Sequence, residues 1–193
     1  MRKKIRVFFL ILMISFFALK SDAGVLIDPY LGYLFPGNAT QGPGDSFKFH
    51  GPVYGIRGGF QETVMLGFDF GKSYLKFKRE KPVYVLPRDY SGTYFSFFAG
   101  VSLPAIPLRF WASYYLYSEY EDGEGRGSGD SYLGDGYGAT IGFTGIPFLS
   151  LNLEFRMFRF DRFEDAISGE KTDLEPDLLS NEIILTVSVP LVF

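Results

Sequence analysis

The sequence predicts an all-β protein, an eight-stranded antiparallel up-and-down transmembrane β-barrel. Three observations lead to this prediction. Apolar residues recur at every second position in eight segments, and the connections between these segments alternate between short and long. Aromatic residues also make up 19% of the chain, beside 23 glycines, no cysteine and one histidine, His50. The missing cysteines exclude disulfide scaffolds, thiol nucleophiles and Cys-based zinc sites, and a single histidine excludes a multi-histidine metal site.

Residues 1–23 have the three parts of a cleaved secretory signal peptide. Four basic residues lie among the first six, residues 7–19 are apolar apart from Ser15, and small side chains occupy positions 21 and 23. A membrane anchor is the alternative, but this stretch is shorter than the roughly 20 residues that an untilted spanning helix needs. We therefore expect cleavage before Gly24 and a barrel domain over residues 24–193.

The charge of the predicted mature chain excludes one class of partner. Of the 193 residues, 170 remain after cleavage, with 14 basic and 21 acidic side chains and a net charge of −7. Nucleic-acid binding needs a basic surface, so no nucleic-acid partner is expected. No later window holds 18 uninterrupted apolar residues, so the mature chain has no predicted transmembrane helix.

Alternation of period two defines the predicted strands. The last segment is the most regular, with Ile183, Leu185 and Val187 on one face and Glu182 and Thr186 on the other. The first, second and fifth segments alternate less regularly, because tyrosine occurs on both of their faces or glycine interrupts them. In chain order, the eight segments are residues 27–35, 53–60, 66–71, 95–103, 108–120, 137–144, 149–160 and 182–193.

The connections indicate how the strands are arranged. Residues 61–63, 104–107 and 145–148 form predicted turns of three or four residues. Strict alternation puts all the short turns at one end of a barrel and all the long loops at the other, which is typical of outer-membrane barrels. The predicted long loops, of 15 to 21 residues each, are residues 36–50, 77–92, 121–135 and 161–181.

The composition of the two faces distinguishes a membrane barrel from a soluble carrier of the lipocalin type. A soluble barrel has bulky apolar side chains inside and charged ones outside. In this chain the polar face is mostly Gly, Ser and Thr, with a few charges, which suits the crowded interior of eight strands. The opposite face is aromatic and aliphatic and suits lipid, so the soluble carrier is the weaker alternative.

The end of the chain resembles the assembly signal of bacterial outer-membrane barrels. Phe193 is preceded by Leu191 and Val189 at every second position. The segments Pro29-Tyr30-Leu31-Gly32-Tyr33 and Tyr54-Gly55-Ile56-Arg57-Gly58-Gly59-Phe60 are similar to early strands of the outer-membrane-protein-A-like, porin-family barrel domain. The resemblance implies an outer-membrane location and recognition by the barrel-assembly machinery. Relatives often carry a peptidoglycan-binding domain after the barrel, and that role is not expected here.

Eight charged residues fall on the predicted inward face. Burying a charge is costly unless it is paired, so three arginines among five acids predict a salt-bridge network that plugs the barrel. The resemblance implies such a plug as well. The alternative is a narrow ion path lined by the same charges, which we consider weaker because eight strands leave little lumen. The residues are Asp28, Arg57, Asp69, Arg109, Glu119, Glu154, Arg156 and Glu182.

The predicted loops differ in charge. Lys76, Lys78, Arg79 and Lys81 make the second hairpin basic, and we expect them to contact lipopolysaccharide phosphates. The third and fourth loops are acidic and are candidates to meet divalent cations, with plain surface charge as the alternative. Residues 121–130 resemble a calcium loop superficially but lack its carboxylate spacing, so no metal site and no cofactor is predicted.

The predicted function is structural or interactive rather than enzymatic. His50 has Ser46 and Asp45 nearby in sequence, but nothing else supports a catalytic triad. The expected roles are membrane integrity or display of surface loops for adhesion or recognition. The expected partners are outer-membrane lipids, lipopolysaccharide and an extracellular ligand bound by the loops. A small channel for ions or solutes is the main alternative, and a lipid-modifying barrel enzyme is a weaker one.

Overall fold

The computed structural model describes residues 24–42, 45–79, 88–103, 105–123 and 129–193. The predicted signal peptide lies outside these described residues. The described chain is almost entirely strand, and eight long strands follow one another in sequence. They are β1 (Gly24–Gln41), β2 (Asp45–Gln61), β3 (Val64–Arg79), β4 (Arg88–Leu103), β5 (Leu108–Asp122), β6 (Ser131–Ile146), β7 (Leu149–Glu164) and β8 (Lys171–Ser188), followed by the two-residue β9 (Leu191–Val192).

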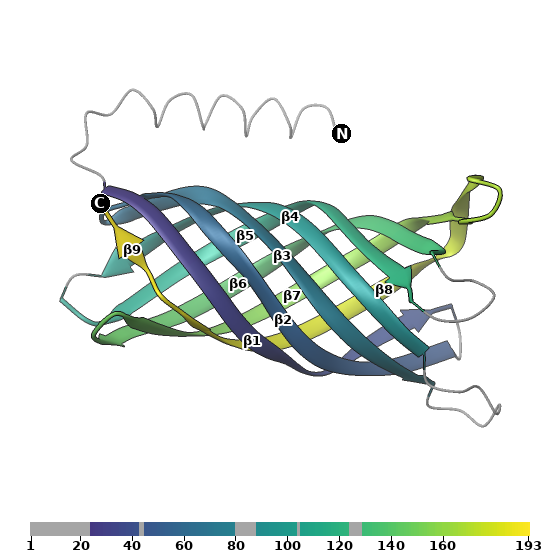
Figure 1. Cartoon of the computed structure of the whole chain (residues 1–193), viewed down its shortest axis with the longest axis horizontal. Helices are drawn as coiled ribbons and strands as arrows, with labels where there is room; N and C mark the ends of the chain where they lie inside the picture. Colours follow the sequence, from purple (N-terminus) through teal and green to yellow (C-terminus); the bar gives the residue numbers. More distant parts are fainter. Residues whose placement is uncertain (1–23, 43–44, 80–87, 104, 124–128) are drawn as a thin grey trace.

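The strands close into an up-and-down antiparallel barrel, as predicted. Each of the eight long strands pairs with its neighbours in sequence, and β1 closes the barrel by pairing with both β2 and β8. Each of the eight long strands is paired on both sides, so their backbone N–H and C=O groups find partners inside the sheet. Figure 1 shows the strands strongly tilted around the barrel, with the C-terminus beside the start of β1. Among the described residues, no helix has the length and apolar character needed to cross a bilayer.

The predicted long loops are wrong in extent, because the strands continue into all four of them. β1 ends only at Gln41 and β2 begins already at Asp45, and β7 ends at Glu164 with β8 beginning at Lys171. Hairpin pairing needs only backbone hydrogen bonds, so it continues after the apolar alternation stops. The strands therefore extend beyond the predicted alternation at the end of the barrel that carries the β1–β2, β3–β4, β5–β6 and β7–β8 connections, which we call the hairpin end.

The last predicted strand, residues 182–193, is interrupted near its end. β8 stops at Ser188, and the chain resumes pairing only at β9, which lies opposite Leu26 and Ile27 of β1. Pro190 has no backbone N–H to donate, which accounts for the break. Phe193 and Val25 then exchange two backbone hydrogen bonds of 3.0 Å. The side chains of Val189, Leu191 and Phe193 are all exposed on the barrel.

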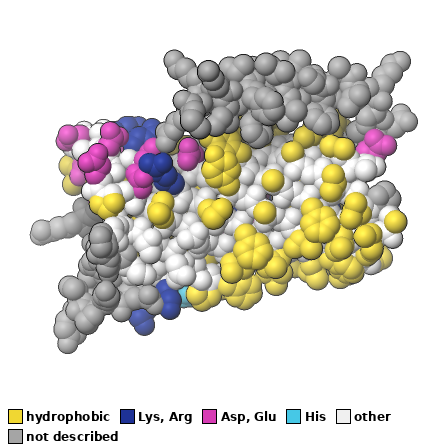
Figure 2. Space-filling model, turned by 180° about the vertical axis from the view of Figure 1, so that it is seen from behind, with side chains coloured by type: hydrophobic (Ala, Val, Ile, Leu, Met, Phe, Trp, Pro, Cys, Tyr) yellow, Lys and Arg dark blue, Asp and Glu magenta, His cyan; other side chains and the backbone are white. Residues whose placement is uncertain are grey.

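The outer face of the barrel is apolar. Leu31, Tyr137 and Met157 are 64%, 59% and 60% exposed, and most other exposed large side chains are also Phe, Tyr, Leu, Ile or Val. Figure 2 shows this hydrophobic surface along the barrel, with most of the visible charged side chains gathered at one end. Because the charged side chains of the central part point inward, the barrel has the reverse of the arrangement in a soluble carrier.

Candidate functional site

The barrel interior holds seven of the eight charged residues that the sequence places on the inward face. All seven are buried, with 4% exposure or less. The strand register explains why some of them meet: Asp28 of β1 lies opposite Arg57 of β2, which lies opposite Asp69 of β3. Asp122 is buried as well, although the sequence predicts a loop there. The seven are Asp28, Arg57, Asp69, Arg109, Glu154, Arg156 and Glu182.

Arg57 lies at the centre of this network. Its Nε is 3.3 Å from Asp69 Oδ2, its Nη2 is 3.3 Å from Glu154 Oε2, and its Nη1 is 3.6 Å from Asp28 Oδ2. The guanidinium carbon also lies 4.1 Å from the centre of the Tyr30 ring. One cation thus joins carboxylates from β1, β3 and β7 across the lumen, which suits the planar fork of arginine.

A second arginine continues the network toward the hairpin end. Arg156 donates from Nε to Glu154 at 2.9 Å and from Nη2 to the Tyr94 hydroxyl at 2.9 Å. Glu154 also accepts a 2.7 Å hydrogen bond from Tyr115. Glu154 therefore receives three donors, which stabilises a carboxylate in a buried position.

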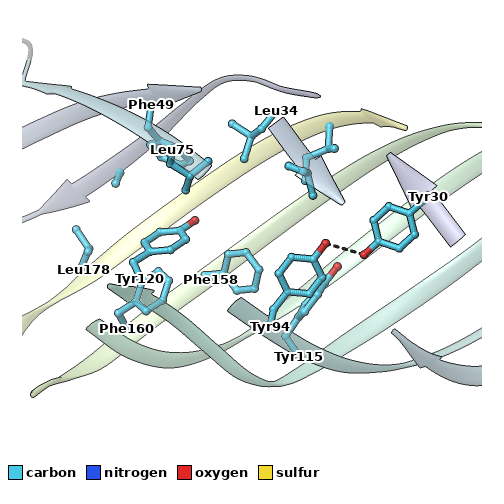
Figure 3. Close-up of a cluster of buried hydrophobic side chains, with 13 residues drawn as sticks. Tyr30, Leu34, Phe49, Leu75, Tyr94, Tyr115, Tyr120, Phe158, Phe160 and Leu178 are labelled. Carbon is cyan, nitrogen blue, oxygen red and sulfur yellow. Dashed lines mark hydrogen bonds between the residues drawn. The ribbon is translucent and has the colours of Figure 1, made fainter. Parts of the chain in front are cut away.

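Three buried tyrosines, Tyr30, Tyr94 and Tyr115, complete the network of buried charges. Sequence analysis did not identify them as part of it. Tyr30 donates to Asp69 at 2.7 Å, and its oxygen also lies 2.7 Å from that of Tyr94. In Figure 3 the hydroxyls of Tyr30 and Tyr94 point toward one another, with Tyr115 beside Tyr94. A signal was present in the sequence, because Tyr30 and Tyr115 share the polar face with Asp28 and Arg109.

The third arginine lies toward the turn end of the barrel. Arg109 donates from Nη2 to Asp28 at 2.8 Å, to Asn152 at 3.1 Å and to Ser188 at 3.2 Å. The Asn152 amide donates in turn to Thr186 and Ser188, at 3.2 and 3.0 Å. Since Asp28 lies between Arg57 and Arg109, the two halves of the network are connected.

Glu182 has a tyrosine rather than an arginine as its hydrogen-bond partner. Its carboxylate accepts a hydrogen bond from Tyr120, whose hydroxyl also lies 3.4 Å from Ser180 Oγ. Within the described part of the chain it forms no ion pair, although its backbone lies opposite that of Arg156. Glu182 thus belongs to a tyrosine–carboxylate pair rather than to the arginine network.

Glu119 is on the outer face, so its predicted inward position is wrong. The pairing of β5 with β6 shifts between Tyr115 and Ser118, and Leu116 and Tyr117 are both exposed. One extra residue in a strand reverses the alternation that follows. Glu119 consequently accepts a 2.6 Å hydrogen bond from the exposed Tyr117.

Large apolar side chains fill the lumen on both sides of the network of buried charges. Toward the turns, Leu26, Met65, Phe98 and Trp111 form a small buried cluster. Toward the hairpins lies a larger one, and Figure 3 shows its rings and aliphatic side chains packed together. The sequence predicts a face of small residues with a few charges, so this aromatic packing was missed. The larger cluster includes Leu34, Phe49, Leu75, Tyr120, Phe158, Phe160 and Leu178.

Glycines on the inner face give these rings their space. Gly55 of β2 lies directly opposite Gly71 of β3. A Cβ on Gly71 would lie 2.5 Å from the Tyr30 hydroxyl oxygen, closer than real Cβ atoms approach. The pairing of two glycines therefore permits the Tyr30–Tyr94 contact.

The hairpin end of the barrel carries the predicted rim charges. Lys76 and Lys78 are exposed on the outer face of β3, while the side chain of Arg79 and all of Lys81 lie outside the described residues. The β7–β8 hairpin is rich in acids and holds three exposed ion pairs, among them Arg159–Asp177 at 2.5 Å and Lys171–Glu164 at 2.9 Å. In the described residues, no group of three or more His, Asp or Glu side chains is placed to hold a metal ion.

His50 contacts the outer-face residue Tyr33. Its Nδ1 lies 2.7 Å from the Tyr33 hydroxyl, and both side chains are exposed. Tyr33 of β1 lies opposite Pro52 of β2, which follows His50 by two residues. The imidazole thus takes part in an interstrand contact at the surface.

Comparison with known proteins relates the chain by its fold. No protein-family model matches it, and no curated protein sequence does. Among solved structures it is similar to Neisserial surface protein A, with 15% identity, a TM-score of 0.54 and coverage of 88% of this chain and 99% of that one. It is also similar to Ail, the attachment invasion locus protein of Yersinia pestis, in two structures, one of them a complex with the heparin analogue sucrose octasulfate. These two have 14% and 12% identity, a TM-score of 0.53, and coverage of 87% of this chain and 99% of that one.

Proposed function

We propose that this protein is a bacterial outer-membrane β-barrel with a closed lumen and a structural or surface-interaction role. Residues 1–23 would direct export and be cleaved, and Val189, Leu191 and Phe193 would be read by the barrel-assembly machinery. In this role the barrel spans the membrane and supports four hairpins at the cell surface, for membrane integrity or for adhesion or recognition.

The membrane location is supported by the outer face. Exposed Phe, Leu, Ile and Val side chains surround the barrel, and such a surface is stable in lipid and prone to aggregate in water. Tyr33, Tyr54, Tyr74 and Tyr137 are exposed between the apolar region and the charged hairpin end. Tyrosine is enriched at the membrane–water interface, where its apolar ring and polar hydroxyl both find a partner.

The packing of side chains inside the barrel is the observation that carries the functional part of the proposal. Arg57 and Arg109 reach across the barrel to Glu154 and Asp28. Arg156 pairs with Glu154 of its own strand and reaches across to the Tyr94 hydroxyl of β4. Apolar clusters fill the space on either side of them. An ion that crossed the barrel would have to displace both the paired charges and the packed rings. We therefore expect this interior to stabilise the folded barrel and not to conduct ions.

Fractionation of a Gram-negative host that expresses the full chain tests the location. We expect the protein in the outer-membrane fraction, without residues 1–23, and with gel migration that changes on heating. Protease treatment of intact cells should cut only at the hairpin end. A soluble periplasmic protein, or one that retains residues 1–23, would contradict the proposal.

A further inference from the structure

Two arginines inside the barrel share a single carboxylate oxygen. Arg109 Nη2 lies 2.8 Å from Asp28 Oδ2, and Arg57 Nη1 lies 3.6 Å from the same atom. Arg57 also pairs with Asp69 and Glu154. Within the described part of the chain, Arg109 pairs with no carboxylate other than Asp28. The charge of Arg109 is therefore only partly balanced, in a buried place where an unbalanced charge is costly.

Four buried nitrogen atoms of this region have no hydrogen-bond partner among the described residues. They are Arg57 Nη1, Arg109 Nε, Arg109 Nη1 and Trp111 Nε1, from side chains that are at most 4% exposed. Guanidinium and indole groups only donate, so they cannot satisfy one another. The other oxygen of the shared carboxylate, Asp28 Oδ1, is an unpartnered acceptor there, but one oxygen cannot serve four nitrogens. Buried donors of this kind point to a ligand that accepts hydrogen bonds.

Trp111 lies against both arginines. The guanidinium carbons of Arg57 and Arg109 are each 5.0 Å from the centre of its ring. Trp111 is on β5, directly opposite Thr140 of β6, whose buried hydroxyl also lacks a partner in the described strands. The unpartnered donors therefore come from β2, β5 and β6 and lie in one part of the lumen, at the edge of the small apolar cluster to which Trp111 belongs.

A ligand in this place has to accept hydrogen bonds from several directions. Water accepts hydrogen bonds, but it also brings two hydrogens that need acceptors of their own, and donors are already in excess here. A monovalent anion brings no hydrogens, and its charge balances the part of the Arg109 charge that the shared carboxylate leaves. A single-atom ion suits donors from three side chains, because it has no preferred direction of its own.

We propose that Arg57, Arg109 and Trp111 bind a halide ion inside the barrel, with chloride as the natural ligand. The side chains hold the ion through their unpartnered N–H groups, and Thr140 adds its hydroxyl. The site is structural, because it joins β2 to β5 through a shared ligand and lies between packed apolar clusters that the ion does not cross. It depends on the barrel interior alone and not on the proposed membrane location.

Urea unfolding of the purified barrel at increasing chloride tests the site. Sodium gluconate replaces chloride so that the ionic strength stays constant, and heat-modifiable gel migration measures the folded fraction. An anion that binds only the folded barrel should raise the folding equilibrium constant about tenfold for each tenfold rise in chloride above its dissociation constant. A wild-type folding equilibrium that does not change with chloride would overturn the site.

Two variants remove donors from the site. R109K keeps a positive charge beside Asp28 but removes two of the four unpartnered nitrogens, and W111F removes a third while it keeps an aromatic ring. Both should lose most of the chloride dependence, and W111F serves alone if R109K does not fold. The matched control is R156K, because Arg156 belongs to the same network and has no unpartnered nitrogen among the described residues. Equal chloride responses in W111F, R109K and R156K would contradict the assignment.

Fluorescence identifies the ligand, because Trp111 is the single tryptophan of the chain. A bromide ion in contact with an indole shortens the lifetime of its excited state. Wild-type and R156K barrels refolded in bromide should therefore have a shorter lifetime than the same barrels refolded in gluconate, whereas R109K should have equal lifetimes. Equal lifetimes in the wild type would mean that the donors hold water, and equal shortening in R109K would mean that bromide reaches the ring by collision. Either result would count against the halide site.

Discussion

Glu154 is the residue on which the interior network depends most. It accepts hydrogen bonds from Arg57, Arg156 and Tyr115, and it is fully buried. Glu154→Gln keeps the volume but leaves two guanidinium groups short of a counter-charge. We expect it to lower the free energy of unfolding by about 3–5 kcal/mol, the typical effect of breaking a buried ion pair. Urea titration in lipid vesicles measures this.

Glu164→Gln is the control for that variant, because Glu164 pairs with Lys171 in an exposed position. Surface pairs contribute at most about 1 kcal/mol, so this variant should unfold nearly as wild type does. Similar losses for the two variants would mean that the buried network contributes little.

Gly71 shows how a residue without a side chain shapes the interior. In Gly71→Ala the new methyl group would have to displace two hydroxyls, that of Tyr94, which is the atom nearest to the Cβ position, and that of Tyr30, which lies 2.5 Å from it. We expect a loss of about 1–3 kcal/mol, the usual effect of overpacking. At Gly58, on β2, nothing lies within 4 Å of a Cβ, so Gly58→Ala should cause no such loss. If both variants unfold alike in urea, the glycine–tyrosine packing is not tight.

At the scale of the element, the β5 bulge at Leu116 and Tyr117 determines which of the following side chains point into the barrel and which point outward. The chain has no cysteine, so a single introduced thiol reports its own position. Glu119→Cys should react readily with a water-soluble maleimide in the folded barrel. Ser118→Cys, at a position that is 1% exposed, should react only after unfolding. The opposite order of reactivity would place the bulge elsewhere or remove it.

The tip of the β7–β8 hairpin is ordered by one carboxylate. Asp165 accepts hydrogen bonds from the backbone N–H groups of Ser168, at 2.7 Å, and Ile167, at 3.0 Å, and from the Ser168 hydroxyl. The Ser168 hydrogen bonds, foremost, hold the pKa of Asp165 below its ordinary value. A lowered pKa means that this stabilisation is present above the unfolded pKa and is lost as the pH falls through the folded pKa.

We therefore expect the hydrogen-exchange protection of the Ser168 amide to be constant at neutral pH and to fall in acid, below the ordinary Asp value of about 3.9. Asp165→Ala should remove this protection at every pH and leave the barrel strands unchanged. Asp173→Ala, on the same hairpin, serves as the control. Protection that is independent of both pH and Asp165 would contradict this role.

On the scale of the whole molecule, the sequence predicts the barrel because each strand separates an apolar outer face from the interior. Alternation in residues such as Ile183, Leu185 and Val187 follows directly from that requirement. The same alternation also places seven buried charges on the inner face, because successive residues of a strand point to opposite faces of the sheet.

The features that sequence reasoning missed depend on more than the alternation of residues along a strand. The bulge at Leu116 and Tyr117 changes the register without altering the composition, so Glu119 was assigned to the wrong face. The strands beyond the apolar region lose their alternation, because in the proposed membrane location water rather than lipid would surround them there. The packing of the Tyr30 hydroxyl against Gly71 can be predicted only when the neighbouring strands and their register are known.

Conductance of the purified protein in planar bilayers tests the closed lumen most directly. The paired charges and the aromatic clusters predict insertion without steady current, under conditions where a porin added to the same bilayer conducts. Glu154→Gln should also remain silent, because the apolar clusters on both sides are unchanged in that variant. Reproducible single-channel steps from wild-type protein would contradict the account.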